Sequence, residues 1–274
     1  MKRTHTIEYG CACTMGKVRR NNEDNFYCDG QLRLDPNSTS DVVLSGKVSS
    51  ATNELFAVFD GMGGEACGEI ASFVAAQHCK VFCEDRTQYE EYLYELANML
   101  NDRILEETEA RSLVLMGTTC AMVQFYKDEI YILNAGDSKI FKHSKNSLNQ
   151  ISVDHVASGY SGKAPLTKFL GTVDKNGLTP YIARGAYKTG DVFVLCTDGV
   201  TDMIDEDTLS ALIGKKEPLE IIAQDIIELA KEKQMVSHIC WGCDKVLNVP
   251  VSIRIGNNKI LLNSDTKLME HHLK

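Results

Sequence analysis

The stretch from residue 55 to residue 64, Leu-Phe-Ala-Val-Phe-Asp-Gly-Met-Gly-Gly, carries the main clue to the fold. Its first five residues are apolar and predict a buried strand. The strand is followed at once by Asp60 and a run rich in glycine, which indicates a turn. A carboxylate at this position is held by a rigid strand, and the neighbouring glycine lets backbone groups approach whatever the carboxylate binds.

The same arrangement of a strand, an aspartate and a glycine recurs twice further along the chain. The apolar run at residues 192–196 is followed by Thr197-Asp198-Gly199, and the strand candidate at 130–133 is followed by Gly136-Asp137. Carboxylates at several strand ends can converge on hard divalent cations, which prefer oxygen ligands. A single Asp-Gly after a strand is usually only a turn, so the pattern alone leaves a purely structural role open.

The remaining sequence pattern predicts short strands mixed with a few long helices. Ile70, Phe73, Val74, Gln77 and Val81 recur at helical spacing, apolar except at Gln77. Further helices are expected at 88–109, 166–170 and 219–231. Other strand candidates lie at 119–126, 140–143 and 249–255. Because these strands cluster in hairpins and do not alternate regularly with helices, the pattern favours α+β layers over a parallel doubly wound sheet.

Length and composition favour one globular domain over residues 1–274. The chain has 43% hydrophobic and 24% charged residues, and it contains no internal repeat or Pro/Ser-rich linker. The net charge of -9 argues against binding to nucleic acid or to an anionic membrane surface. We find no signal peptide and no run of about 20 apolar residues that would span a bilayer. Ten cysteines without such a signal point to reduced thiols and a cytoplasmic location.

Seven short segments, taken in order, resemble the motif series of the PPM/PP2C-type metal-dependent phosphatases. They extend from residue 19 to residue 202, and the small bacterial members are the nearest match. The two most specific are FDGMGG and TDGVTD. The segments are RRNNEDN (19–25), VFDGMGG (58–64), GTT (117–119), AGDS (135–138), DH (154–155), FLG (169–171) and CTDGVTD (196–202).

The resemblance implies a fold and a set of site residues. The expected fold is a central β-sandwich of two antiparallel sheets flanked by helices, in four α-β-β-α layers. Matching positions are expected to hold two Mn²⁺ or Mg²⁺ ions, with a third, weaker site in some members. The implied roles are a bridging ligand for Asp60, a carbonyl ligand for Gly61, water-mediated ligands for Glu23 and Asp24, a first-cation ligand for Asp198, third-cation ligands for Asp137 and Asp202, and a phosphate-binding role for Arg19.

These roles suit hydrolysis of phosphoserine and phosphothreonine in proteins. Two cations close together can hold a bridging water, lower its pKa and clamp the phosphoryl oxygens for in-line attack. An arginine fork pairs well with phosphate oxygens; the alternatives for Arg19 are a solvated surface charge or replacement in this role by Arg20. The implied partners are phosphorylated proteins and a Ser/Thr kinase acting on the same proteins.

The chain departs from the family pattern in two places. Met62 stands where many eukaryotic relatives have a histidine, so the general acid is not identified. The stretch from about residue 235 to residue 274 is atypical. Asp244 is the candidate for the last ligand of the first cation, but Lys245 and Leu247 replace the usual asparagine and threonine, and Pro250 interrupts the strand signal.

Three classes of function follow from these observations. An active phosphatase is favoured by the ordered motifs. A pseudophosphatase, which binds phosphoproteins without turnover, is the alternative that the atypical C-terminal stretch raises. A scaffold whose Asp-Gly segments are only turns would require all seven motifs to be coincidental. Cys240 and Cys243 form a C-x-x-C pair, for which free thiols are favoured over a zinc site shared with Cys11 and Cys13.

Overall fold

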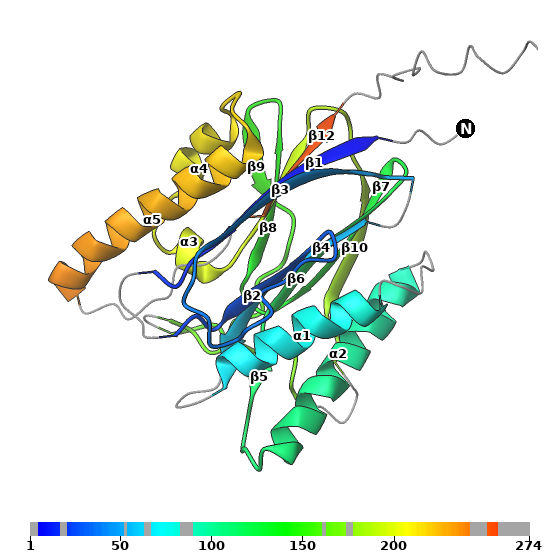
Figure 1. The fold of residues 1–274 in the computed structure, drawn as a ribbon, viewed down its shortest axis with the longest axis vertical. Coiled ribbons are helices and arrows are strands. Elements are labelled where there is room, and N and C mark those ends of the chain that lie inside the picture. Colours follow the sequence, from blue (N-terminus) through cyan, green and yellow to red (C-terminus); the bar gives the residue numbers. More distant parts are fainter. Residues whose placement is uncertain are drawn as a thin grey trace, which may run out of the picture.

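The computed structural model describes residues 5–16, 21–51, 54–62, 67–82, 90–160, 163–173, 178–241 and 251–256. Two antiparallel sheets lie face to face, and helices cover both outer faces (Figure 1). This arrangement confirms the predicted four-layer α-β-β-α sandwich.

Sheet A is the sheet that contains the first strand. Its strand order is β3-β1-β12-β11-β8-β9. The strands are β1 (Thr6–Cys13), β3 (Val42–Ser49), β8 (Lys139–Ser144), β9 (Ser147–Gln150), β11 (Val192–Cys196) and β12 (Val251–Gly256). β12 therefore lies in the middle of the sheet, between β1 and β11.

Sheet B contains β4 (Glu54–Met62), which carries Asp60. The turn expected at Asp60-Gly61 is wrong, because the strand continues to Met62 and its last two residues pair with Gly117 and Thr118. The strand order of sheet B is β10-β7-β6-β4-β2, and the short β5 pairs with the end of β4. The strands are β2 (Asp24–Cys28), β4 (Glu54–Met62), β5 (Gly117–Thr118), β6 (Cys120–Tyr126), β7 (Glu129–Ala135) and β10 (Tyr181–Ala186).

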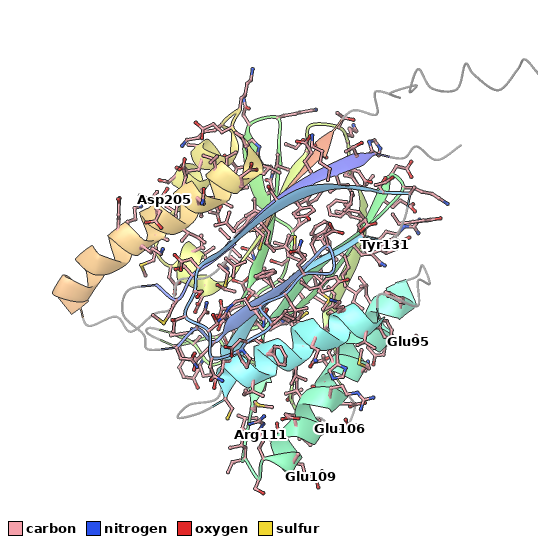
Figure 2. The ribbon with its side chains drawn as sticks, viewed as in Figure 1. Glu95, Glu106, Glu109, Arg111, Tyr131 and Asp205 are labelled. Carbon is pink, nitrogen blue, oxygen red and sulfur yellow. The ribbon has the colours of Figure 1, made fainter. Side chains whose placement is uncertain are left out.

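Helices cover the outer faces of the two sheets separately. α1 (Gly68–Phe82) and α2 (Glu90–Ala110) pack on sheet B, while α3 (Asp198–Thr201), α4 (Glu206–Ile213) and α5 (Leu219–Trp241) lie on the side of sheet A (Figure 1). Asp205 begins α4 by accepting a hydrogen bond from the Thr208 N–H, and Figure 2 labels it on this side of the molecule. The labelled Tyr131 belongs to the opposite layer, where it packs between sheet B and its helices.

Apolar side chains fill the spaces between the four layers. Between the sheets, Phe125 makes edge-to-face contacts with Phe56 and Phe193, at centroid separations of 6.0 and 5.4 Å. β1 and the start of α5 approach each other closely at Gly10. A Cβ at this position would lie 2.3 Å from the backbone of Leu219. Glycine at this position therefore lets α5 lie directly on β1.

Two segments, at 166–170 and 249–255, differ from the predicted secondary structure or are described only in part. The helix predicted at 166–170 is wrong: Leu166 forms a β-bridge with Val156, and Leu170 forms one with Thr118. The spacing of Leu166 and Leu170 therefore reflects two separate β-bridges and not one face of a helix. The strand expected at 249–255 is observed as β12, although residues 249 and 250 lie outside the described residues. Among the described residues, no helix combines the length and apolarity required to cross a membrane.

Candidate metal centre

Asp24 and Asp60 form the centre of the candidate site. They are paired directly across β2 and β4, because the register of these antiparallel strands places Asp24 opposite Asp60. Asp24 is only 2% exposed, and Asp60 is half-buried. Two carboxylates held this close in a poorly solvated place repel each other unless a proton or a cation compensates their charge.

Thr118 and Thr119 hold the backbone of Asp60 in place. The Asp60 N–H donates to Thr119 Oγ1 at 3.0 Å, and the Asp60 carbonyl accepts from the Thr119 N–H and from Thr118 Oγ1, both at 2.8 Å. Thr119 Oγ1 also lies 2.6 Å from Ser138 Oγ. The Gly-Thr-Thr motif therefore fixes the main chain that carries the central aspartate.

Asn22 and Arg33 hold the backbone around Asp24. The Asp24 N–H donates to Asn22 Oδ1 at 3.1 Å. Arg33, which is buried, donates from Nη1 to the carbonyl oxygens of Asn22 and Asp24. A buried guanidinium with carbonyl partners costs less than an unpaired charge, and here it fixes the start of β2.

Gly61 follows Asp60 in a place where only glycine fits. A Cβ at this position would lie 2.0 Å from the Gly68 carbonyl oxygen and 2.4 Å from the Glu23 carbonyl oxygen. The Gly61 N–H donates to that same Glu23 carbonyl at 3.0 Å. The main chain after Asp60 is thus packed between the residue before Asp24 and the start of α1, which brings Glu23, Asp24, Asp60 and Gly61 together.

Asp198 reaches the site from sheet A. It opens the one-turn helix α3 directly after β11, and its side chain is 13% exposed. The preceding Thr197 hydrogen-bonds the Asp24 side chain, so the end of β11 is tied to the start of β2. Asp202 ends the same helical turn, where its N–H donates to the Asp198 carbonyl at 2.8 Å, and its side chain is exposed.

Asp137 lies at the end of β7 in a turn fixed by His155. Gly136 has a φ of 110°, which favours glycine. The His155 N–H donates to the Gly136 carbonyl at 2.9 Å, and the Gly136 N–H donates to His155 Nδ1 at 3.3 Å. These two bonds give His155 a structural role. The Asp137 side chain lies close enough to Asp198 and Asp60 for their charges to interact.

Burial and mutual repulsion raise the pKa values of these carboxyl groups. The pKa of Asp24 is raised to about 8, mainly by burial and partly by the negative charge of Asp198. The pKa of Asp60 is raised well above its usual range by burial and then by Asp24 and Asp198. The pKa of Asp137 is raised by burial and by Asp198. Several carboxyl groups therefore share one poorly solvated region, which a cation would stabilise in the ionised form.

The residues present fit divalent cations in their chemistry. Asp24 Oδ2 is buried with no hydrogen-bond partner, and the donor set consists of carboxylates and a backbone carbonyl, as Mg²⁺ and Mn²⁺ prefer. No three His, Cys, Asp or Glu side chains of the described residues form a ready-made metal site. Mg²⁺ usually keeps several water molecules in its coordination shell, so these carboxylates need to supply only part of it.

The structure thus brings Glu23, Asp24, Asp60, Gly61, Asp137 and Asp198 to one end of the sandwich, with Asp202 on the same helical turn as Asp198. Arg19, Asp244 and the Gly63-Gly64 pair lie outside the described residues. Lys163 forms an ion pair with Asp198 and was missed by sequence reasoning. It lies in a stretch without regular pattern, where no motif distinguishes it from neighbouring lysines.

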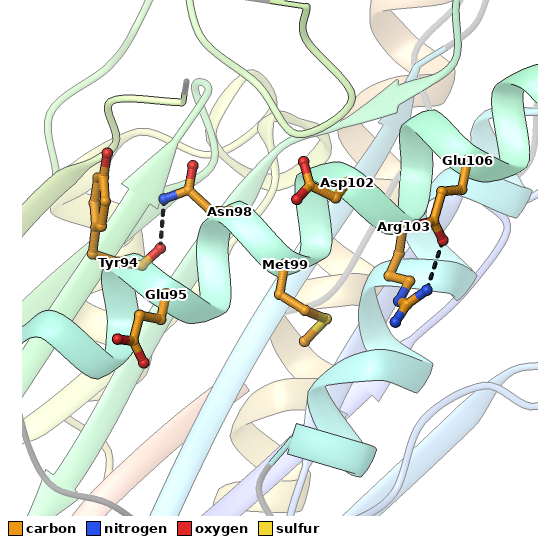
Figure 3. A pocket seen from close by; sticks show the side chains of 7 residues that line it. All are labelled: Tyr94, Glu95, Asn98, Met99, Asp102, Arg103 and Glu106. Carbon is orange, nitrogen blue, oxygen red and sulfur yellow. Dashed lines mark hydrogen bonds and ion pairs between the residues drawn. The ribbon is translucent and has the colours of Figure 1, made fainter. Parts of the chain in front are cut away.

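A separate depression lies on the outer face of α2, far from these carboxylates in the chain. Its lining residues all belong to one helix (Figure 3): Tyr94, Glu95, Asn98, Met99, Asp102, Arg103 and Glu106. Arg103 and Glu106 pair at 2.7 Å and are both largely exposed. None of the predicted site residues lines this depression, so it is not the candidate metal centre.

Comparisons with known proteins agree with this fold. The chain is 25% identical to the serine/threonine phosphatase stp of Listeria welshimeri over 227 residues, which are 74% of this chain and 82% of the relative. The fold matches a crystal structure of the Mycobacterium tuberculosis phosphatase PstP with a TM-score of 0.72 at 22% identity, covering 92% of this chain and 100% of the other. A PstP catalytic domain in complex with 2 manganese ions matches with a TM-score of 0.70 at 23% identity and the same coverage.

A family comparison gives the assignment. The family model described as protein phosphatase 2C matches residues 41–234. This span covers most of the chain and includes Asp60, Asp137, Asp198 and Asp202. The chain therefore belongs to the protein phosphatase 2C family.

Proposed function

We propose that this chain is a metal-dependent phosphoprotein phosphatase that hydrolyses phosphoserine and phosphothreonine with two Mn²⁺ or Mg²⁺ ions. The observation that carries the proposal is the pair of facing carboxylates, Asp24 and Asp60, joined by Asp198 from the other sheet. Buried like charges of this kind destabilise a fold unless they serve a ligand. Family membership makes a phosphorylated protein the expected substrate.

The ligands divide between the two sheets. Asp60 would bind both cations, with the Gly61 carbonyl on one of them, and Asp198 and Asp244 would complete the first site. Glu23 and Asp24 would hold water molecules of the coordination shell, and Asp137 and Asp202 would form a third, weaker site. When bound, the cations supply charge neutralisation at the phosphoryl group and an activated water.

The chain's own residues perform the positioning. Thr118 and Thr119 fix the Asp60 main chain, and Arg33 fixes that of Asp24. Arg19 is the candidate for binding the phosphoryl oxygens by a bidentate contact. The substrates would be phosphorylated on Ser or Thr by a kinase. The seven cysteines whose side chains the structure describes are all free thiols, which supports a cytoplasmic location.

The test is hydrolysis of a phosphothreonine peptide and of p-nitrophenyl phosphate, with Mn²⁺ and with EDTA. We expect Mn²⁺-dependent turnover by the wild-type chain. Asp244→Ala should lose most of it if Asp244 completes the first site, whereas Arg19→Ala should mainly raise KM. Wild-type protein that binds a phosphopeptide without turnover at any Mn²⁺ concentration would favour the pseudophosphatase instead, an alternative that the relatives named above do not support.

A further inference from the structure

Lys163 connects the segment between β9 and β10 with the candidate metal centre. Its Nζ forms an ion pair with Asp198 Oδ2. The Lys163 side chain is 58% exposed, whereas that of Asp198 is 13% exposed. A long, solvated side chain therefore reaches down to a carboxylate that belongs to the site.

The charge of Lys163 acts on more than its direct partner. It lies close enough to Asp60 and Asp137 to oppose the rise in the pKa of each carboxyl group. The ammonium group thus lies among three of the carboxylates that would hold cations. A position that attracts an ammonium group in this way also attracts a divalent cation.

Other lysines around the site have different partners. Lys139 pairs with Asp154, and Lys168, which lies only five residues after Lys163, donates from Nζ to the Thr179 carbonyl at 2.8 Å. Lys168 is therefore a matched position: it has the same charge and belongs to the same segment, but it contacts a neutral backbone group.

We propose that Lys163 is a phosphate-binding residue that exchanges partners, pairing with Asp198 until a divalent cation takes that carboxylate and then with the phosphoryl group of the substrate. This inference rests on the proposed function. A phosphate dianion held by cations at this site brings new negative charge to the place that the Lys163 ammonium group already reaches. A lysine suits the exchange, because its charge is compact and its four-carbon chain is flexible.

The exchange predicts opposite effects on two ligands. While Lys163 pairs with Asp198, it competes with the first cation, so removing its charge should strengthen cation binding. Once cations are bound, Lys163 helps to hold phosphate, so the same change should weaken phosphate binding. A lysine that only stabilised its own loop would not move the two affinities in opposite directions.

Calorimetric titrations of the full chain test this. Mn²⁺ is titrated without phosphate, and inorganic phosphate is titrated into Mg²⁺-saturated protein, which keeps phosphate soluble. For Lys163→Met we expect the Mn²⁺ Kd to fall about fivefold and the phosphate Kd to rise about tenfold. Lys163→Arg should stay near the wild type, because it keeps the charge. Lys168→Met should change both values less than about twofold, since its charge is screened by solvent.

Two outcomes would overturn the inference: a Lys163→Met protein whose Mn²⁺ Kd is unchanged or higher, or a loss of phosphate affinity that is equal in Lys163→Met and Lys168→Met. Both titrations measure binding alone. A wild-type chain that binds Mn²⁺ and phosphate but does not hydrolyse the phosphopeptide would contradict the proposed function and leave the assignment of Lys163 standing.

Discussion

The two halves of the candidate metal centre are built differently. The half on sheet B consists of Asp24 and Asp60, whose main chains are held by Thr118, Thr119 and Arg33. The half on sheet A consists of Asp198, which opens a helix of only one turn, and Asp202, which caps the C-terminal end of that helix. The Asp198 side chain is paired with a solvated lysine, whereas Asp24 is almost completely buried.

This difference separates a fixed side from an adjustable one. Carboxylates on paired strands keep their positions whether or not a ligand is present, because several hydrogen bonds hold the main chain of each. A carboxylate on a short helix with an exposed partner can change that partner at little cost. We therefore expect substitutions on sheet B to affect turnover most, while those around Asp198 mainly alter ligand affinity.

The largest effect is expected for Asp60→Asn. It removes the charge that would lie between two cations but conserves the volume of the side chain, so turnover of a phosphothreonine peptide with Mn²⁺ should fall by about a thousandfold or more. The melting temperature in EDTA should stay equal or rise, because repulsion with Asp24 is removed. Asp102→Asn, on the exposed face of α2, is the control. Near-normal turnover of Asp60→Asn would refute the two-cation assignment.

A smaller loss is expected for Thr119→Val, which tests the fixed side directly. The Asp60 N–H would lose its acceptor and Ser138 its hydroxyl partner, so the free energy of unfolding should fall by about 1–3 kcal/mol. We expect turnover to fall about tenfold, as measured on the same peptide. Thr108→Val, which removes a hydroxyl bonded within α2, should leave turnover unchanged. Equal turnover losses in the two variants would show that Thr119 does not position Asp60.

The pH dependence of stability in EDTA tests the buried sheet B side of the site. The pKa of Asp24 is raised from 3.8 to about 8 in the folded protein. Between these values the folded chain binds more protons than the unfolded chain, so the Asp24 contribution to the free energy of unfolding decreases as pH rises, and it is fully lost above pH 8. The melting temperature of wild-type protein should decline relative to Asp24→Asn by at least about 2 °C per pH unit. Parallel curves for the two proteins would contradict the assigned pKa.

The smallest effect is expected far from the site, for Arg103→Ala on α2. Its ion pair with Glu106 is exposed to solvent (Figure 3), so its loss should change the free energy of unfolding by less than about 0.5 kcal/mol. Phosphopeptide turnover should be unchanged. Denaturant unfolding and the peptide assay measure both, and a clear fall in turnover would mean that this face of α2 takes part in function.

Sequence reasoning predicted the layers of the fold because most elements have a clear period. The strand β4 was predicted from its apolar run, although it continues through the expected Asp-Gly turn to Met62. Helix α2 was predicted from its content of Leu, Glu and Ala. Helix α1 was predicted from apolar spacing, but of those apolar positions only Val74 is buried, and Val81 is 60% exposed. The helix prediction at 166–170 failed because Leu166 and Leu170 are four residues apart, as in a helix, but Leu166 forms a bridge with Val156 and Leu170 with the more distant Thr118. Such pairing depends on tertiary contacts that the local sequence does not encode.

The motifs assigned six carboxylates and Gly61 to the candidate site, but they did not indicate which residues hold these groups in place. The Gly-Thr-Thr motif was recognised without its role, which depends on the β4–β5 contact. Lys163 had no signal, because its partner Asp198 lies 35 residues away. Arg19 and Asp244 remain predictions.

The position of β12 has a consequence for how the protein is made. β12 pairs with β1 on one side and with β11 on the other, although β1 leaves the ribosome long before β12 has been synthesised. During that interval the edge of β1 that faces β12 has no native partner, and neither does the corresponding edge of β11. An unpaired strand edge is a site of aggregation. Nascent chains of this protein therefore need their last described strand before sheet A is protected, and we expect chains that terminate before β12 to depend on chaperones.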